Sequence, residues 1–183
     1  DAKKLEFEKL VEEVRGKHDY DCIVPFSGGK DSTYTLWYLV KELGLKPLVV
    51  RFDHGFMRST LIENNIRTFR KLGCDVMTFT PNWQVVRKLM FEALRRRADF
   101  CWHCHTGIFA YPMRIAVEKQ VPLVIWGEPS AEYASFYGYD EDEEVDERRF
   151  NTLVNLGINA EDMIGMLDNT IGEYPVTARD LKP

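Results

Sequence analysis

The hexapeptide Ser27-Gly28-Gly29-Lys30-Asp31-Ser32 follows the apolar run Ile23–Phe26 and precedes apolar residues at helical spacing. This order predicts a strand, a tight loop and a helix. Gly28 and Gly29 lack a Cβ, so their backbone N–H groups can approach an anion closely. The start of the helix adds further N–H groups and a positive dipole end. The sequence therefore predicts a phosphate-binding loop.

Charged and hydroxyl side chains complete this predicted loop. Ser27 and Ser32 can donate hydroxyl hydrogens, and Asp31 can bind a magnesium ion that bridges to a phosphate. The spacings of a Walker loop and of a dinucleotide-binding loop are both absent. The hexapeptide is therefore a different phosphate cradle. The simpler alternative is a Gly-Gly turn in which Asp31 is only a first-turn charge.

Apolar runs separated by helical patterns extend this unit along the chain. Strands are predicted at residues 21–26, 47–52, 75–79 and 121–126, the second of them buried, with helices between them. A strand, helix and strand of this length form a right-handed unit with parallel strands. We therefore expect an α/β fold, a doubly wound parallel sheet with helices on both faces. Its ligands should bind at the carboxyl ends of the strands.

Length and composition favour one well-buried globular domain. The 183 residues are 45% hydrophobic and 29% charged, and 24 basic against 29 acidic residues give a net charge of −5. General affinity for nucleic acid is therefore not expected. No apolar run approaches the roughly 18 residues of a membrane helix, and we expect a cytoplasmic setting. The expected division is a leading helix at 1–20, the phosphate-loop domain at 21–167 and a tail at 168–183.

The hexapeptide resembles the PP-loop of the ATP pyrophosphatase superfamily, whose signature is S-G-G-x-D-S between the first strand and the first helix. The resemblance implies an adenine nucleotide alpha hydrolase-like fold that binds ATP and Mg²⁺. It places the pyrophosphate end of ATP on the loop. We expect adenine near the end of the second strand, because the parallel sheet opens there. The implied nucleotide-binding residues are Ser27, Gly28, Gly29, Lys30, Asp31, Ser32, Asp53 and Gly127. Asp31 is the implied magnesium ligand.

Acidic residues follow two of the predicted strands. Asp53 comes directly after the second strand, where the superfamily has an acidic residue that helps to shape the nucleotide and metal site. Glu128 follows the fourth strand, and a carboxylate there can hold a metal or orient a nucleophilic amine. A polar turn at Asp53 and a helix N-terminal charge at Glu128 are the structural alternatives. We expect Lys30, Asp31 and Glu128 to be the catalytic residues.

The segment Cys101-Trp102-His103-Cys104-His105 places two thiols at metal-ligand spacing and adds two imidazoles. Structural zinc takes four ligands, whereas this thiol pair supplies two. A buried and reduced thiol pair among aromatic residues is the alternative. Cys101 and Cys104 are thus candidate zinc ligands that need further ligands from elsewhere, and both interpretations stay open.

Residues 52–56, 101–109 and 125–129, together with the phosphate loop, resemble the N-acetyl sugar amidotransferases of bacterial surface-polysaccharide synthesis, including that of lipopolysaccharide O-antigen and nonulosonic acids. The resemblance implies that ATP adenylates the acetamido oxygen of an N-acetylated nucleotide sugar. Pyrophosphate is released in this step. Ammonia then displaces AMP to give an acetamidino group. It also implies a glutaminase subunit that supplies the ammonia. A homo-oligomer is a further expectation, whereas membrane and nucleic-acid partners are not expected.

Two other functions fit the same loop. A PP-loop tRNA thiolase often has a C-x-x-C pair at this point, but those with an iron–sulfur cluster use a later third cysteine, and Cys104 is the last one here. The acidic balance also argues against tRNA. The third candidate is a non-catalytic domain that binds a nucleotide without turnover, in which the acidic residues would be idle.

The helix before the cysteine segment carries a predicted buried face and a basic end. The apolar residues at helical spacing are Trp83, Val86, Met90, Ala93 and Leu94. Arg95–Arg97 end this helix, and we favour compensation of the helix dipole over contact with a substrate phosphate. In the following helix, Pro112 predicts a kink or a new start.

Overall fold

The computed structural model describes residues 2–127, 157–158 and 162–163, and these divide into two compact units. The first unit, residues 2–52, 56–79 and 111–127, holds the sheet and its helices. The second unit holds residues 53–55 and 80–110 together with the described residues beyond 156. The predicted tail at 168–183 lies outside the described residues.

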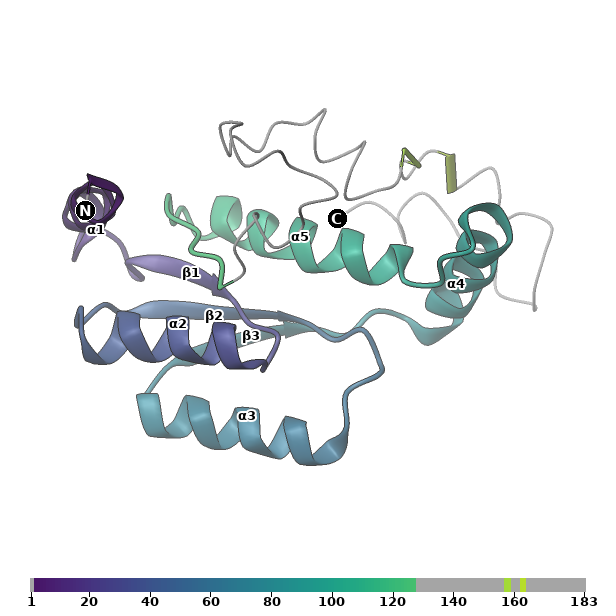
Figure 1. Ribbon diagram of the computed structural model, residues 1–183, viewed down its shortest axis with the longest axis horizontal. Helices are drawn as coiled ribbons and strands as arrows, with labels where there is room; N and C mark the ends of the chain where they lie inside the picture. The colour runs from purple at the N-terminus through teal and green to yellow at the C-terminus, as the bar shows by residue number, and fades with distance from the viewer. Residues whose placement is uncertain (1, 128–156, 159–161, 164–183) are drawn as a thin grey trace. The chain divides into compact units, whose positions relative to one another are not determined.

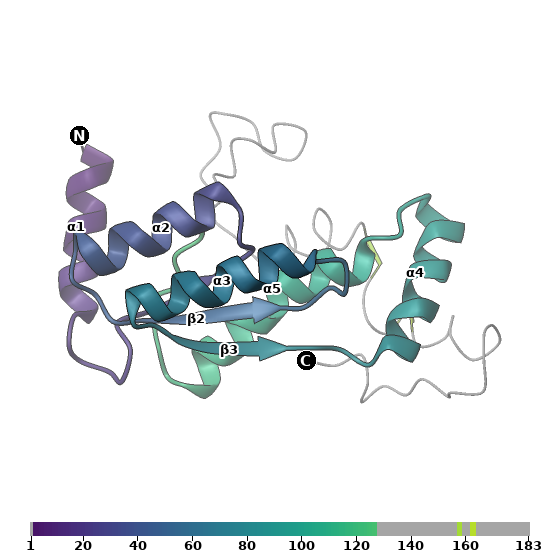
Figure 2. The same ribbon diagram turned by 90° about the horizontal axis from the view of Figure 1, so that it is seen from below.

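Strands and helices alternate along the first unit in the predicted order (Figure 1). The described elements are α1 (Ala2–Val14), β1 (Cys22–Pro25), α2 (Lys30–Lys41), β2 (Pro47–Phe52), α3 (Ser59–Leu72), β3 (Asp75–Phe79), α4 (Trp83–Arg97) and α5 (Trp102–Glu118). The sheet has the order β1-β2-β3, and both strand pairs are parallel. Figure 2 shows the arrows of β2 and β3 pointing the same way. The predicted α/β fold with a parallel sheet is confirmed.

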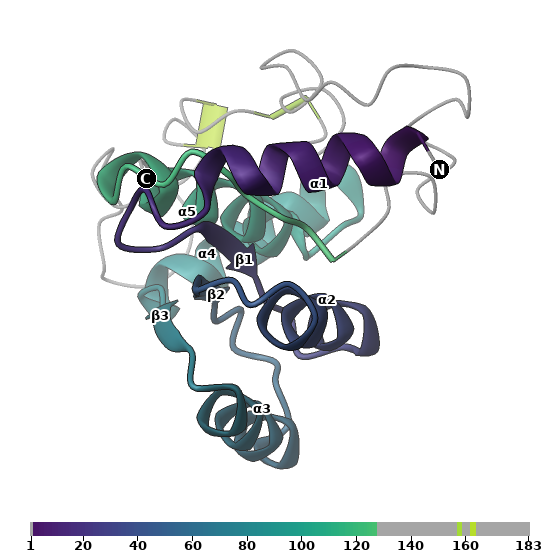
Figure 3. The same ribbon diagram turned by 90° about the vertical axis from the view of Figure 1, so that its left-hand side faces the viewer.

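Side chains of the strands alternate between two apolar clusters, one on each face of the sheet. The first cluster joins strand residues to α2 and α3 and includes Val24, Val49, Leu36, Leu39 and Phe69. The second joins strand residues to α5 and includes Ile23, Leu48, Val50, Ile115 and Ala116. Figure 3 shows α2 and α3 on one side of the sheet and α5 on the other. The sheet is therefore doubly wound, as predicted.

The fourth predicted strand is reduced to a single parallel bridge between Ile23 and Val124. The Ile23 N–H donates to the Leu123 carbonyl over 2.8 Å, and the Ile125 N–H donates to the Ile23 carbonyl over 2.9 Å. The next N–H of β1 on this side would belong to Pro25, which has none. The prediction of a full strand at 121–126 is therefore wrong in extent, although its position beside β1 and its direction are right.

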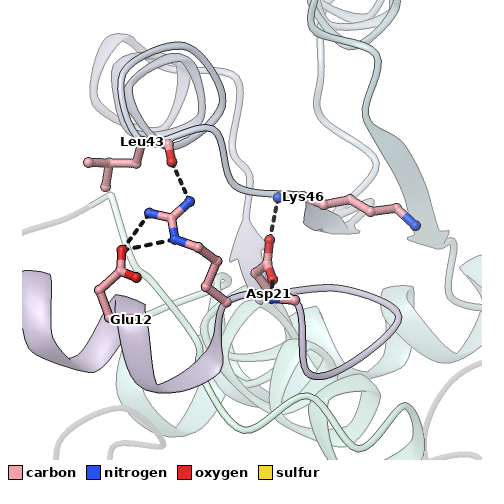
Figure 4. Close-up of polar contacts among 6 residues, drawn as sticks. Glu12, Asp21, Leu43 and Lys46 are labelled. Atoms are coloured by element: carbon pink, nitrogen blue, oxygen red, sulfur yellow. Dashed lines mark hydrogen bonds and ion pairs between the residues drawn. The ribbon is translucent and has the colours of Figure 1, made fainter.

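Asp21 and Arg15 tie the end of α1 to the sheet unit (Figure 4). The Asp21 carboxylate accepts the Gly16 N–H over 2.6 Å and the Lys46 N–H over 2.7 Å. Arg15 donates to the Leu43 carbonyl over 2.7 Å. These bonds fasten the leading helix to the segment that enters β2. The leading helix and the sheet consequently belong to the same compact unit.

α5 continues through Pro112, so the predicted new start is not seen. Proline removes one i→i−4 hydrogen bond, which a 17-residue helix can lose without ending.

Within the described ranges, no helix combines the length and apolarity that crossing a bilayer requires.

Candidate functional site

The phosphate loop runs from the end of β1 to the first turn of α2. Gly29 is the N-cap of α2, with φ −73° and ψ 176°, and no side chain in the described part of the chain caps this helix start. Gly28 has φ +87°, a left-handed conformation that other residues adopt only at a cost. The first N–H groups of a helix have no partner within it, so an uncapped helix start that follows a glycine turn can bind an anion. The local backbone therefore has the form of an anion site.

Two serine hydroxyls close this loop on itself. The Gly28 N–H donates to Oγ of Ser32 over 3.2 Å, and the Gly29 N–H donates to Oγ of Ser27 over 3.3 Å. The two hydroxyl oxygens lie 3.1 Å apart. A hydroxyl can donate its own hydrogen while its oxygen accepts another, so both serines can donate to an anion. The loop thus gathers two amides and two hydroxyls, the donor set predicted for phosphate.

Gly127 lies directly against the first turn of α2. A Cβ at this position would be 2.7 Å from Cα and 2.9 Å from N of Ser32, so only glycine fits without displacing backbone. The segment after the bridge at Val124 therefore reaches the phosphate loop, where the sequence placed Gly127. Glu128, the predicted catalytic carboxylate, lies outside the described residues, and its role stays a prediction.

Asn65 of α3 lies beside the phosphate loop, although the sequence motifs gave no indication of it. Its side chain is buried, with 1% of the residue exposed, and it lies beside Gly28. Leu61, Asn65 and Phe69 recur at i, i+4 and i+8 on one helix face, so Asn65 interrupts an apolar stripe. A polar residue within such a stripe is the sequence signal that could have identified it.

Lys30 and Asp31 put opposite charges on the first turn of α2. Their side chains are 86% and 48% exposed, and Nζ of Lys30 lies 3.1 Å from Oδ1 of Asp31. An ion pair this exposed contributes little to stability, so either group can turn to a ligand at small cost. Asp31 offers the hard carboxylate oxygen that magnesium prefers. The Asp31 carboxylate therefore fits the role of a magnesium ligand, and this role stays a prediction.

Asp53 belongs to the second unit, where it organises a turn. Its Oδ1 accepts the Gly55 N–H over 3.0 Å, and its Oδ2 accepts the hydroxyl of Thr80 over 3.3 Å. This is the polar turn that the sequence offered as the structural alternative. Each carboxylate oxygen retains a lone pair, so the geometry leaves the predicted nucleotide role of Asp53 as a prediction.

The cysteine segment forms the start of α5 in the second unit. Oδ1 of Asp99 accepts the Cys101 N–H over 2.7 Å, and the Cys101 carbonyl accepts the N–H groups of Cys104 and His105. Trp102 is buried in a cluster with residues of α4, and its Nε1–H donates to the Ile158 carbonyl over 3.2 Å. Packing of Trp102 thus fixes where the two thiols lie in this unit.

The pKa values of both thiols of this segment are shifted upward. Burial raises the pKa of Cys104 to about 11, and it also raises the pKa of Cys101, in both cases reinforced by the Asp99 charge. Burial lowers the pKa of His103. Hydrogen bonds with backbone groups of His54 and Phe100 partly offset this downward shift. Among the described residues, no three His, Cys, Asp or Glu side chains converge as metal ligands. The zinc site proposed for Cys101 and Cys104 therefore gains no support.

Replacing Cys101 and Cys104 together with alanine is expected to lower the free energy of unfolding by about 1–3 kcal/mol, because removal of two partly buried sulfur atoms leaves small cavities. Pyrophosphate release per folded molecule should stay unchanged if the thiols only pack. Chemical denaturation and elemental analysis check this. Stoichiometric zinc in the unchanged chain, lost in the double variant, would show that the thiols are metal ligands.

Comparison with known proteins gives partial similarities. No protein-family model matches the chain. Over 131 residues the chain is 30% identical to an uncharacterized protein of Methanocaldococcus jannaschii, a match that covers 66% of this chain and 46% of that protein. Over 82 residues it is 33% identical to a glutamine-hydrolyzing GMP synthase of Pyrobaculum aerophilum, covering 44% of this chain and 16% of that enzyme. The chain thus spans less than half the length of these curated relatives.

The GMP synthase similarity agrees with the loop motif. At the coarse level, it points to an ATP-using domain of the PP-loop ATP pyrophosphatase type. The strand, glycine loop and helix start described above are compatible with such a domain.

Proposed function

We propose that this chain is an ATP-dependent amidotransferase that converts the acetamido group of an N-acetylated nucleotide sugar to an acetamidino group. The observation that carries the proposal is the loop itself, in which the Gly28 and Gly29 amides and two serine hydroxyls converge at the start of α2. Partial similarity to a glutamine-hydrolyzing GMP synthase supports ATP-dependent transfer of ammonia. The sugar substrate rests on the resemblance of residues 52–56, 101–109 and 125–129 to the sugar amidotransferases.

The chemistry needs two displacements. The acetamido oxygen attacks the α-phosphorus of ATP, and the bond from that phosphorus to pyrophosphate breaks. Ammonia then adds to the activated carbon, and the C–O bond to AMP breaks as a proton is lost to solvent or a base. The amide oxygen leaves readily only after adenylation, which is why ATP is consumed.

The loop residues act on the first displacement. N–H groups of Gly28 and Gly29 and the hydroxyls of Ser27 and Ser32 would stabilise the negative charge that builds on departing pyrophosphate. Lys30 adds a mobile positive charge, and Asp31 would hold Mg²⁺, which neutralises phosphate charge when bound. Glu128 is assigned to orienting the ammonia, and a separate glutaminase subunit is assigned to supplying it.

A substrate-dependent assay tests this function. The protein is incubated with ATP, magnesium and ammonium, with and without a UDP-linked N-acetylated sugar or tRNA, and AMP and pyrophosphate are measured. We expect equimolar release that depends on the sugar and on ammonium. Release that depends on tRNA instead would favour the thiolase, and ATP binding with no release in any arm would favour a non-catalytic nucleotide-binding domain.

A further inference from the structure

The carboxamide of Asn65 occupies the space where a side chain of residue 28 would lie. A Cβ built on Gly28 would be 2.6 Å from both Oδ1 and Nδ2 of Asn65. Asn65, which belongs to α3, therefore contacts the loop at Gly28, the residue with the left-handed φ of +87°. Both residues belong to the first unit.

Asn65 uses little of its hydrogen-bonding capacity although it is buried. Among the described residues its carboxamide makes one hydrogen bond, from Nδ2 to Sδ of Met57 over 3.9 Å, and a thioether is a weak acceptor. The same sulfur accepts from a guanidinium N–H of Arg51 over 3.2 Å, which anchors Met57 to β2. Burial of a carboxamide with so few partners costs free energy, so packing alone does not account for asparagine here.

We propose that Asn65 is a positioning residue for the phosphate loop, bracing Gly28 in its left-handed conformation so that the loop amides point at the bound pyrophosphate end of ATP. This inference rests on the proposed function. Glycine has more backbone freedom than any other residue, so an unbraced Gly28 would have to be ordered when the ligand binds. The carboxamide also keeps donors and an acceptor beside the loop backbone, which an aliphatic residue would not. Asn65 thus lowers the entropic cost of binding.

The variant Asn65→Ala tests the brace, and Asn64→Ala is its matched control on the preceding, exposed residue. Calorimetric titration with ATP and with inorganic pyrophosphate measures affinity. We expect Asn65→Ala to weaken both by about tenfold, the effect of ordering roughly one backbone residue on binding. Asn64→Ala should leave both affinities unchanged. If Asn65→Ala does not fold, Asn65→Ser, which keeps a small polar group, takes its place.

A double-mutant cycle separates a local brace from general destabilisation. Gly28→Ala puts a methyl group against the Asn65 carboxamide, and removal of that carboxamide opens the space. The double variant should therefore bind ATP no more weakly than Gly28→Ala alone, and its melting temperature should show the same non-additivity.

The outcomes are distinct. Affinities of Asn65→Ala or Asn65→Ser within about twofold of the unchanged protein, or losses that multiply in the double variant, overturn the positioning role. Failure of the unchanged protein to bind either ATP or pyrophosphate overturns the proposed function. The melting-temperature cycle needs no ligand, so it still decides whether Asn65 and Gly28 are in direct contact.

Discussion

Asp31→Asn is expected to reduce magnesium-dependent pyrophosphate release by about 10²-fold or more, because charge stabilisation through a bound metal amounts to several kcal/mol. The fold should persist. The Asp31 side chain is 48% exposed, and in the described part of the chain it forms an ion pair with the still more exposed Lys30. Removal of one such surface charge changes no core volume.

Glu63→Gln is the matched control for this variant, since it removes an exposed carboxylate from α3 in the same unit. Pyrophosphate release over a magnesium titration, with circular dichroism to verify folding, distinguishes the two variants. Undiminished release by Asp31→Asn would show that the carboxylate is not a magnesium ligand, and a loss in Glu63→Gln would point to a general charge effect.

The strands were predictable because parallel strands are short, largely apolar runs between chain-breaking residues. β2 is buried, whereas the residues of β3 are half-buried or exposed. β2 and β3 occupy the ranges expected from Pro47–Phe52 and Asp75–Phe79. The turn between β1 and α2 was predictable for a similar reason, since two adjacent glycines between an apolar run and a helical pattern mark a loop. Its role in binding phosphate stays a prediction. Local sequence was sufficient wherever local backbone geometry determined the element.

Helix α4 shows where periodicity of apolar residues misleads. Trp83 and Leu94, assigned to its buried face, are 47% and 52% exposed, whereas Lys88 and Glu92 are buried. Arg95 and Arg96 donate to Oε2 of Glu92 over 2.8 and 3.2 Å, so these arginines pair with a buried carboxylate. Burial of a charge depends on partners that a hydrophobicity pattern does not record. Compensation of the helix dipole therefore does not by itself explain why arginines lie at the end of α4.

Contacts between distant segments were the other part that the sequence could not supply. Asn65 lies 37 positions after Gly28, and nothing in the loop motif indicates that a side chain from α3 must lie beside it. The extent of the segment at 121–126 likewise depended on Pro25 in the neighbouring strand. In both cases the deciding residue belongs to another element of the sheet unit.

Gly127→Ala is expected to destabilise the first unit by roughly 1–3 kcal/mol and to weaken ATP binding. The added Cβ would be 2.7 Å from Cα of Ser32 and 2.9 Å from its N, and these backbone atoms can move only if the first turn of α2 moves. Ser32 also holds the Gly28 amide, so the loop would shift with the helix. Chemical denaturation and ATP titration measure the two effects.

Gly29→Ala is the matched comparison for the stability effect alone. Gly29 has φ −73°, which suits alanine, and its added Cβ would meet Oγ of Ser27 at an ordinary 3.5 Å. Its free energy of unfolding should therefore change by less than about 1 kcal/mol, because the restriction of the unfolded chain by alanine is offset by the lower preference of alanine for the N-cap position. Equal stability of Gly127→Ala and Gly29→Ala would mean that residue 127 does not lie against Ser32 in solution. A loss confined to Gly127→Ala would establish that the segment after the single bridge holds the start of α2, and with it the phosphate loop, in place.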